Sequence, residues 1–290
     1  MATAAQWVEG ARPRTLPAAV APVAVGTGAA VHVDGAVWWR AGVCLVVALA
    51  LQVGVNYAND YSDGVRGTDA DRVGPLRLVG SGAAAPAAVK RAALASFAVA
   101  AVAGLALVVA SGAWALLLVG AACIAAAWYY TGGSRPYGYS GLGEVSVFVF
   151  FGLVATVGTN YVQTLDLHAA EVLGGVGCGA LACAVLVANN LRDIPTDAVA
   201  GKRTLAVLLG DTRTRVLYAA LVAVAALVVL AAGVLSPWSL LGLVPFALAV
   251  RPVRAVLAGA SGRDLVPVLG GTGRLLLAYG LLLGLGLALG

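Results

Sequence analysis

Long apolar runs constrain the fold of this chain more than any motif does. A membrane-spanning helix needs about 20 mainly apolar residues, and 61% of the 290 residues are hydrophobic while only 11% are charged. This composition excludes a soluble protein and is typical of a polytopic membrane protein. We therefore predict one all-α domain, residues 1–290, in the lipid bilayer. Its nine apolar runs cover residues 15–33, 38–56, 88–111, 114–131, 142–160, 172–188, 214–233, 236–251 and 270–289.

The basic residues predict the orientation of these runs. If the N-terminus is cytoplasmic, only Arg40 falls outside, so 18 − 1 = 17 of the 18 Lys and Arg residues lie inside. The positive-inside rule then predicts nine transmembrane helices with the N-terminus in and the C-terminus out. The long, charged loops after the second and sixth runs face inward, so we expect a multi-pass cell-membrane protein whose active site faces the cytoplasm.

The net charge of +5 is explained by this topology and, more weakly, by attraction to anionic lipid or a diphosphate. The basic residues are spread over several short loops, and no platform of aromatic and basic residues appears. We therefore expect no nucleic-acid partner.

Two short acidic segments interrupt the apolar pattern, each at the downstream end of a run. Residues 56–71 read NYANDYSDGVRGTDAD, and residues 189–197 read NNLRDIPTD. A carboxylate at a helix centre in hydrocarbon costs roughly 2.5 to 3.5 kcal/mol on insertion scales. Several carboxylates gathered at two membrane edges therefore need partners that offset this cost, and a divalent cation is one such partner.

The two segments repeat one spacing. Asn59 and Asp63 are four residues apart, as are Asn189 and Asp193, and the two pairs are separated by 189 − 59 = 130 residues. Residues four apart share a helix face, so each pair points in one direction, and a four-helix pseudo-repeat is a fair hypothesis. Carboxylate and amide oxygens suit Mg²⁺, whereas a zinc site would want His or Cys, which neither segment contains.

Three further polar residues flank these pairs. Asn56 and Asp60 form a neighbouring stripe on the first helix, and Asp197 would continue the face of the second. Pro195 is expected to end or kink the second helix near Ile194, which would place Asp197 in a loop that can move. Each segment alone could be only a helix end with a polar loop, or a solvated salt-bridged face. The repeated pattern favours the metal site.

Basic residues follow both acidic segments. Arg72 and Arg77 come after the first, Lys202 and Arg203 come after the second, and Arg135 lies in a loop between them. Cations of this kind, together with a metal, bind diphosphate and neutralise its charge as it departs. Simple anchoring by the positive-inside rule remains the alternative for each of them.

Tyrosines gather on the same side, where they would form either an interfacial aromatic belt or ring faces that stabilise a carbocation. They are Tyr57, Tyr61, Tyr129, Tyr130, Tyr137 and Tyr139.

In combination, these motifs resemble the UbiA superfamily of intramembrane aromatic prenyltransferases. The resemblance runs from about Arg12 to Leu209 and rests on four segments, residues 11–26, 56–82, 129–144 and 189–210. Within the superfamily, the stretch from Gly74 to Arg77 and the loop at Tyr137 to Tyr139 are most similar to the branch that prenylates 1,4-dihydroxy-2-naphthoate for menaquinone. The resemblance implies a ring of nine helices around a central cavity that opens sideways to lipid. Two Asp-rich motifs would hold Mg²⁺ on the cytoplasmic side.

The resemblance also implies roles for individual residues. Gly67 stands where the wider superfamily has an Asp, and Asp69 or Asp71 is expected to substitute. Asp60 would be a ligand or would support one, and it joins the expected catalytic set of Asn59, Asp63, Asp193 and Asp197. The expected metal ligands are Asn59, Asp63, Asp69, Asn189, Asp193 and Asp197. The expected substrate-binding residues are Asn56, Arg72, Arg77, Arg135, Tyr137, Tyr139, Asn189 and Lys202.

The expected reaction transfers a polyprenyl group from polyprenyl diphosphate to the naphthoate, with loss of CO₂ and diphosphate. Transfer to another aromatic acceptor, such as 4-hydroxybenzoate or homogentisate, is the alternative within the superfamily. A cation transporter is the alternative from another class. It is disfavoured because the acidic residues lie at the ends of the runs and not mid-span.

Overall fold

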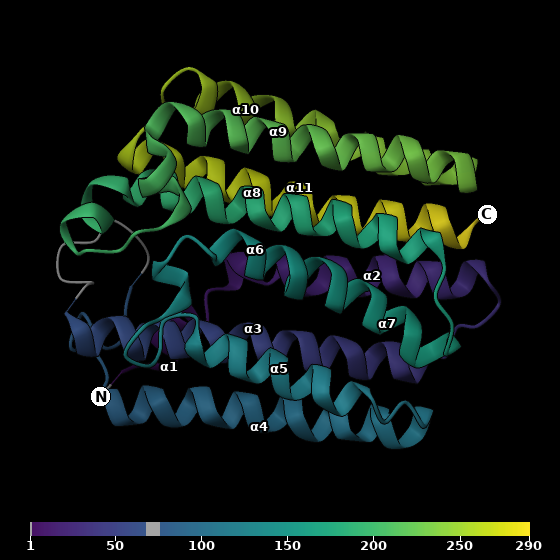
Figure 1. Cartoon of the computed structure of the whole chain (residues 1–290), viewed down its shortest axis with the longest axis horizontal. Coiled ribbons are helices and arrows are strands. Elements are labelled where there is room, and N and C mark those ends of the chain that lie inside the picture. Colours follow the sequence, from purple (N-terminus) through teal and green to yellow (C-terminus); the bar gives the residue numbers. More distant parts are fainter. Residues whose placement is uncertain (1, 68–75) are drawn as a thin grey trace.

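The computed structural model describes residues 2–67 and 76–290, and all regular structure in these residues is helical (Figure 1). This confirms the all-α prediction. In chain order the elements are α1 (Ala4–Gly10), η1 (Pro13–Thr15), α2 (Pro17–His32), α3 (Trp38–Arg66), α4 (Pro86–Ser111), α5 (Leu116–Tyr129), η2 (Tyr137–Tyr139), α6 (Gly143–Val147), η3 (Phe148–Val154), α7 (Ala155–Thr164), α8 (Ala169–Val199), α9 (Leu205–Leu235), η4 (Pro237–Ala249), α10 (Val250–Leu257), η5 (Gly262–Asp264) and α11 (Leu265–Ala288).

Every predicted apolar run lies on a helix, but the elements differ in length. Within the described part of the chain, seven helical segments are long and apolar enough to cross a membrane. The first run belongs to a pair of helices, Ala4–Thr15 and Pro17–His32, that is bent by 50° and would make an eighth span. The fourth run is α5, whose 14 residues extend about 21 Å at 1.5 Å per residue. That is shorter than a hydrocarbon core of about 30 Å.

The second and sixth runs continue as helix well beyond their apolar parts. α3 extends to Arg66 and α8 to Val199, so both acidic segments lie largely on helices. Pro195 does not end α8, because the helix passes through it to Val199. The prediction that Asp197 lies in a loop is therefore wrong. The hydroxyl of Thr196 donates to the Asp193 carbonyl at 3.0 Å, which adds a bond in the turn that proline weakens.

The helices form two groups with a layer between them. Figure 1 shows α3, α4 and α5 on one side, α8 to α11 on the other, and α2, α6 and α7 between them. The largest buried apolar cluster lies in the second group and joins α8, α9 and α11 to α2. A smaller cluster, which includes Tyr57, Leu78 and Phe97, joins α3 to α4.

Glycines allow the helices of the second group and α2 to approach closely. A Cβ atom added at Gly28 of α2 would lie 2.1 Å from the Gly284 carbonyl oxygen of α11. One at Gly280 would lie 2.5 Å from Ala21 Cα. In lipid, apolar side chains gain little by leaving hydrocarbon, so helices associate largely through close van der Waals contact. Small residues allow that contact because they let the backbones approach.

One arginine joins three helices at the end of the bundle opposite the acidic segments. Arg40 of α3 donates to the Val162 carbonyl of α7 at 2.8 Å and to the Ala110 carbonyl of α4 at 2.7 Å. Both carbonyls belong to the last turns of their helices, which have no intrahelical partner. The guanidinium thus holds α4 and α7 together at this end.

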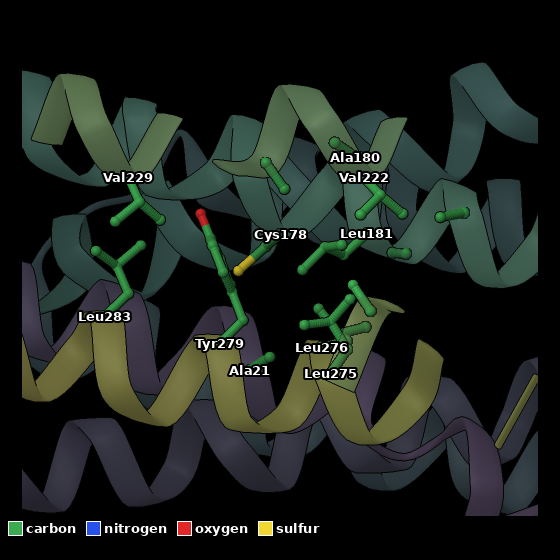
Figure 2. Packing of buried hydrophobic residues seen from close by; sticks show 14 of the residues in the cluster. Ala21, Cys178, Ala180, Leu181, Val222, Val229, Leu275, Leu276, Tyr279 and Leu283 are labelled. Carbon is green, nitrogen blue, oxygen red and sulfur yellow. The ribbon is translucent and has the colours of Figure 1, made fainter. Parts of the chain in front are cut away.

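We predict that Gly177→Ala lowers the stability of the bundle. Figure 2 shows Tyr279 beside Cys178 in the buried cluster, and a Cβ atom at Gly177 would lie 1.8 Å from the Tyr279 hydroxyl. Overpacking of this kind typically costs about 1 to 3 kcal/mol, so thermal unfolding in detergent should show a midpoint several degrees lower.

Tyr279→Phe is the matched control for this prediction. Among the described residues the buried Tyr279 hydroxyl has no hydrogen-bond partner, so its removal should leave the midpoint unchanged or raise it. An unchanged midpoint in Gly177→Ala would contradict the close α8–α11 contact.

Candidate active site

A cavity of about 1520 Å³ runs through the molecule beside α3. The α3 residues that line it extend from Cys44 to Asp63, roughly 28 Å at 1.5 Å per residue. Along α4, α5, η3 and α7 its wall is almost entirely apolar. Polar side chains gather where α3 and α8 end, and we call this part the polar end and the remainder the apolar body. The shape suits an amphiphile with a small charged head and a long hydrocarbon tail.

Asp63 is the centre of the polar end. It is 3% exposed, and its Oδ1 accepts a hydrogen bond from the Tyr139 hydroxyl. Its Oδ2 lies 3.4 Å from Lys202 Nζ and 3.9 Å from an Arg77 guanidinium nitrogen. The Tyr139 ring in turn has Lys202 Nζ 4.8 Å and Arg66 Cζ 5.6 Å from its centroid. Three cations therefore surround one carboxylate and one ring.

The second acidic segment presents a similar arrangement from α8. Arg192 holds Asp193 with two bonds, Nε to Oδ1 at 2.7 Å and a terminal nitrogen to Oδ2 at 2.8 Å. The same terminal nitrogen donates to Asn189 Oδ1 at 2.9 Å. Asp197 lines the cavity one turn further along. The two segments thus meet at one end of one cavity.

Arg192 is a site residue that the sequence reasoning assigned only to membrane topology. Neighbouring positions on a helix point about 100° apart, which placed Arg192 off the face shared by Asn189 and Asp193. Its long side chain curls back to both of them and lies buried in the cavity wall. Its place inside the acidic motif was the available signal.

Asn59 and Asn56 both line the cavity and also hold neighbouring segments in place. Asn59 Oδ1 accepts from the Thr131 hydroxyl at 2.8 Å. Asn56 Nδ2 donates to the Ala11 carbonyl at 2.8 Å and to the Thr15 hydroxyl at 3.0 Å. Asn56 thereby holds η1 against α3 and brings a basic pair that the sequence reasoning did not assign to the site, Arg12 and Arg14, into the wall.

Asp60 differs from the other acidic residues of its segment. It is fully buried outside the cavity wall, and its two oxygens accept from the backbone amides of Leu78 at 2.7 Å and Val79 at 3.0 Å. The geometry does not support the expectation that Asp60 is a ligand or a catalytic group. It positions the segment that carries Arg77.

The loop before α6 contains Arg135, Tyr137 and Tyr139. Both tyrosines line the cavity, but the arginine does not. Tyr137 lines the cavity, and its hydroxyl donates to the Ala126 carbonyl at 2.8 Å and lies 2.9 Å from the Ser146 hydroxyl. Burial raises the pKa of the Tyr137 phenol, so it stays protonated and links α5 to α6. Arg135 is exposed and does not line the cavity, so the geometry does not support its expected role in substrate binding.

The remaining expectations fall at the end of α3. Gly67 ends this helix with φ at 74°, a left-handed conformation that favours glycine. This explains why the helical spacing of the first motif stops there. Asp69, Asp71, Arg72 and Gly74 lie outside the described residues.

The donor atoms at the polar end fit Mg²⁺ by their chemistry. Across the described ranges, no three His, Cys, Asp or Glu side chains lie close enough to form a metal cluster, and cations contact both Asp63 and Asp193. Amide and carboxylate oxygens nevertheless converge there from two helices. An all-oxygen set of this kind suits Mg²⁺, which binds through one or two carboxylates and keeps places for phosphate oxygens and water.

We predict that Asp60→Asn destabilises the protein by about 1 to 3 kcal/mol, because an amide NH₂ would then face a buried backbone N–H. Thermal unfolding in detergent measures the change. Asp211→Asn is the matched control: Asp211 pairs with Arg215 on the same helix and is largely exposed, so its loss should cost less than about 1 kcal/mol. Equal effects would contradict the positioning role of Asp60.

Comparison with known proteins identifies the family. Residues 19–265 match the UbiA prenyltransferase family. A 1,4-dihydroxy-2-naphthoate octaprenyltransferase of Mycobacterium tuberculosis is 57% identical over 290 residues, 100% of this chain and 99% of the relative. The enzyme of the same name from Mycobacterium leprae is 56% identical over 273 residues, 94% of this chain and 92% of the relative.

The fold is also that of a solved structure, a UbiA homolog from Archaeoglobus fulgidus bound to GPP and Mg²⁺. The two superpose with a TM-score of 0.68 and 14% identity, over 96% of this chain and 99% of the other. The chain therefore belongs to the UbiA prenyltransferase family.

Proposed function

We propose that this protein transfers a polyprenyl group from polyprenyl diphosphate to 1,4-dihydroxy-2-naphthoate. The cavity carries the proposal, because it joins two acidic motifs and several cations at one end to a long apolar body. Relatives that are 57% and 56% identical over nearly their whole length are named for this acceptor. Loss of CO₂ and diphosphate gives a demethylmenaquinol, which is oxidised to demethylmenaquinone, so the chain acts in menaquinone biosynthesis.

We further propose that the whole chain is one domain of nine spans around the cavity, with the N-terminus and the active site at the cytoplasmic face. Seven spans are the long helical segments. The eighth would be the bent pair that α1 and η1 form with α2, and the ninth would be the short helix α5. The chain termini lie at opposite ends of the bundle (Figure 1), as an odd number of crossings requires. The distribution of basic residues supports the orientation.

We assign the Mg²⁺ ligands to the two acidic motifs: Asn59, Asp63, Asn189, Asp193 and Asp197, with Asp69 as an expected addition outside the described residues. When bound, Mg²⁺ supplies positive charge that stabilises the departing diphosphate. Lys202, Arg77 and Arg192 already lie beside Asp63 and Asp193. They are placed to bind the remaining diphosphate oxygens, a role we also expect for Arg72.

The apolar body holds the isoprenoid tail, and the polar end meets the charges that develop as the allylic C–O bond breaks. Negative charge on the diphosphate oxygens is met by Lys202 and Arg77, which are held in place before the reaction. The Tyr139 ring contacts both Lys202 and Arg66, and its hydroxyl donates to Asp63, so we assign Tyr139 to orienting Lys202 and Asp63. Tyr130 and Tyr137 also line the cavity. We assign their ring faces to stabilising positive charge on the tail.

The test is prenyl transfer by the purified protein in detergent, with and without Mg²⁺. The naphthoate, 4-hydroxybenzoate and homogentisate are supplied separately with a polyprenyl diphosphate, and product mass and CO₂ are followed. Mg²⁺-dependent product from the naphthoate alone, with release of CO₂, is the expected result. Product from another acceptor would leave the assignment of the site unchanged but would place the enzyme in another pathway. Ion flux in vesicles without any prenyl donor, and no product, would favour a transporter.

We predict that Asp63→Ala and Asp193→Ala each lower the rate of transfer at least about 100-fold, because each removes a metal-binding carboxylate and leaves buried cations without their partner. Membrane insertion, followed by fractionation and gel filtration, should be unchanged. Asp211→Ala, which changes an acidic residue away from the cavity wall, should retain activity. Full activity in both cavity variants would refute the metal assignment.

We predict that Lys202→Met raises the KM for polyprenyl diphosphate on the order of ten-fold, because it removes one charge-assisted bond to phosphate worth about 1.5 kcal/mol or more. Steady-state kinetics at saturating acceptor measure this. Arg135→Met is the control, since Arg135 is exposed and outside the cavity wall. A larger effect in Arg135→Met than in Lys202→Met would restore Arg135 to the diphosphate site.

A further inference from the structure

A buried glutamate lies behind the cavity wall, at a place that the proposed mechanism does not use. Glu144 is in the first turn of α6 and is 7% exposed. Its Oε1 accepts a hydrogen bond from Asn190 Nδ2 of α8 at 3.0 Å, and its backbone carbonyl accepts from Cys183 Sγ at 3.1 Å. In the part of the chain that the structure covers, its Oε2 has no hydrogen-bond partner.

Asn190 contributes to the cavity wall, whereas Glu144 does not. Asn190 directly follows Asn189 and lies one turn from both Asp193 and Leu186, which also line the cavity. Tyr130, Tyr137 and Ser146 line the cavity as well. Tyr130 and Tyr137 stand edge to face with centroids 5.5 Å apart. A Cβ atom added at Gly143, next to Glu144, would lie 3.0 Å from the Tyr130 hydroxyl and 3.5 Å from Leu186, so Tyr130 lies at this part of the wall.

The glutamate determines which way the Asn190 amide faces. The Asn190 NH₂ group donates to Glu144 Oε1, and a carboxyl oxygen in this position can only accept that hydrogen bond. The amide carbonyl oxygen is then the polar atom that Asn190 can offer to the cavity. It is a hydrogen-bond acceptor in a fixed orientation, suited to an O–H donor and unsuited to a carboxylate or a diphosphate oxygen.

Anchoring α6 to α8 does not by itself require a carboxylate. A buried carboxylate with one hydrogen bond is costly, and a glutamine of the same size would join the two helices without a charge. A carboxylate does what a glutamine cannot, because a glutamine amide could rotate and allow Asn190 to rotate with it. The accepting oxygen of Glu144 therefore holds Asn190 in one orientation.

We propose that Asn190 binds a phenolic hydroxyl of the aromatic acceptor and that Glu144 is its positioning residue. This inference rests on the proposed function, since it concerns the acceptor of the same reaction. The naphthoate has two hydroxyl groups, and one hydrogen bond to Asn190 would orient the ring between the diphosphate and the tyrosines. Acceptors without the matching hydroxyl would lose this contact.

The test compares KM values for the two substrates in variants of the pair. Asn190→Leu should raise the acceptor KM on the order of ten-fold, the effect of one lost hydrogen bond, and leave the KM for polyprenyl diphosphate within about two-fold. Asn190→Asp alone should also raise the acceptor KM, because it places two carboxylates together. Adding Glu144→Gln to Asn190→Asp should restore it to within about three-fold. The introduced glutamine amide then donates to the introduced carboxylate and leaves one carboxylate oxygen for the acceptor.

Acceptor analogues separate a direct contact from a structural role. Inhibition constants are measured for 1-hydroxy-2-naphthoate and 4-hydroxy-2-naphthoate, each of which lacks one hydroxyl group. For one of them, Asn190→Leu should change the inhibition constant less than about two-fold while it still weakens binding of the dihydroxy compound. A merely structural change in the wall would weaken all three alike, and that result would overturn the proposal.

Glu171→Gln is the matched control. Like Glu144, Glu171 is buried and has one unpartnered oxygen among the described residues, but it lies in the first turn of α8, at the end opposite Asn190. The acceptor KM of Glu171→Gln should stay within about two-fold of wild type. A rise as large as that of Asn190→Leu would overturn the proposal. Failure of the proposed function looks different, because wild type would then not prenylate the naphthoate at all. If wild type prenylates a different acceptor, the KM values of the Asn190 and Glu144 variants would be compared for that acceptor and its hydroxyl group.

Discussion

The contact between Asp63 and its cations organises the polar end of the cavity. This buried carboxylate belongs to α3, but the groups around it come from three other parts of the chain: Tyr139 from η2, Arg77 from the segment before α4, and Lys202 from the loop between α8 and α9. A charge so far from water needs such partners. Because they are diphosphate-binding groups as well, one network both closes this end of the bundle and prepares it for substrate.

The apolar body depends on contacts of another kind. Glycines bring α2 and α11 within backbone contact on one side and let side chains of both helices lie against α8. Arg40 joins α3, α4 and α7 at the far end. Between them the cavity stays open, because α5 has no fully buried side chain and leaves its inner face to the cavity. The molecule thus combines a tightly packed half with a more open half that provides room for a hydrocarbon tail.

Sequence reasoning located the two acidic motifs but not the contacts of the residues around them. The spacing of Asn59, Asp63, Asn189 and Asp193 follows the helical period, and all four line the cavity. The errors concern neighbours of these residues. Asp60 turns away to bind backbone amides, Arg192 curls back into the wall, Pro195 leaves α8 unbroken and Arg135 stays outside. The position of Asp60 depends on a segment about 18 residues away, whereas Arg192 and Pro195 depend on side-chain bonds within one turn of α8. Helical spacing alone predicts neither kind of contact.

The sequence by itself determined the class of protein, the helical runs, the two acidic motifs and the family, because hydrophobicity, helical period and motif residues are local properties. Only the tertiary structure decided that both motifs meet at the end of one cavity and that the Tyr139 ring contacts Lys202 and Arg66. It also decided that Glu144 reaches Asn190 from another helix. These contacts join residues far apart in the chain, and packing of the helices selects among the many pairings that the same local patterns allow.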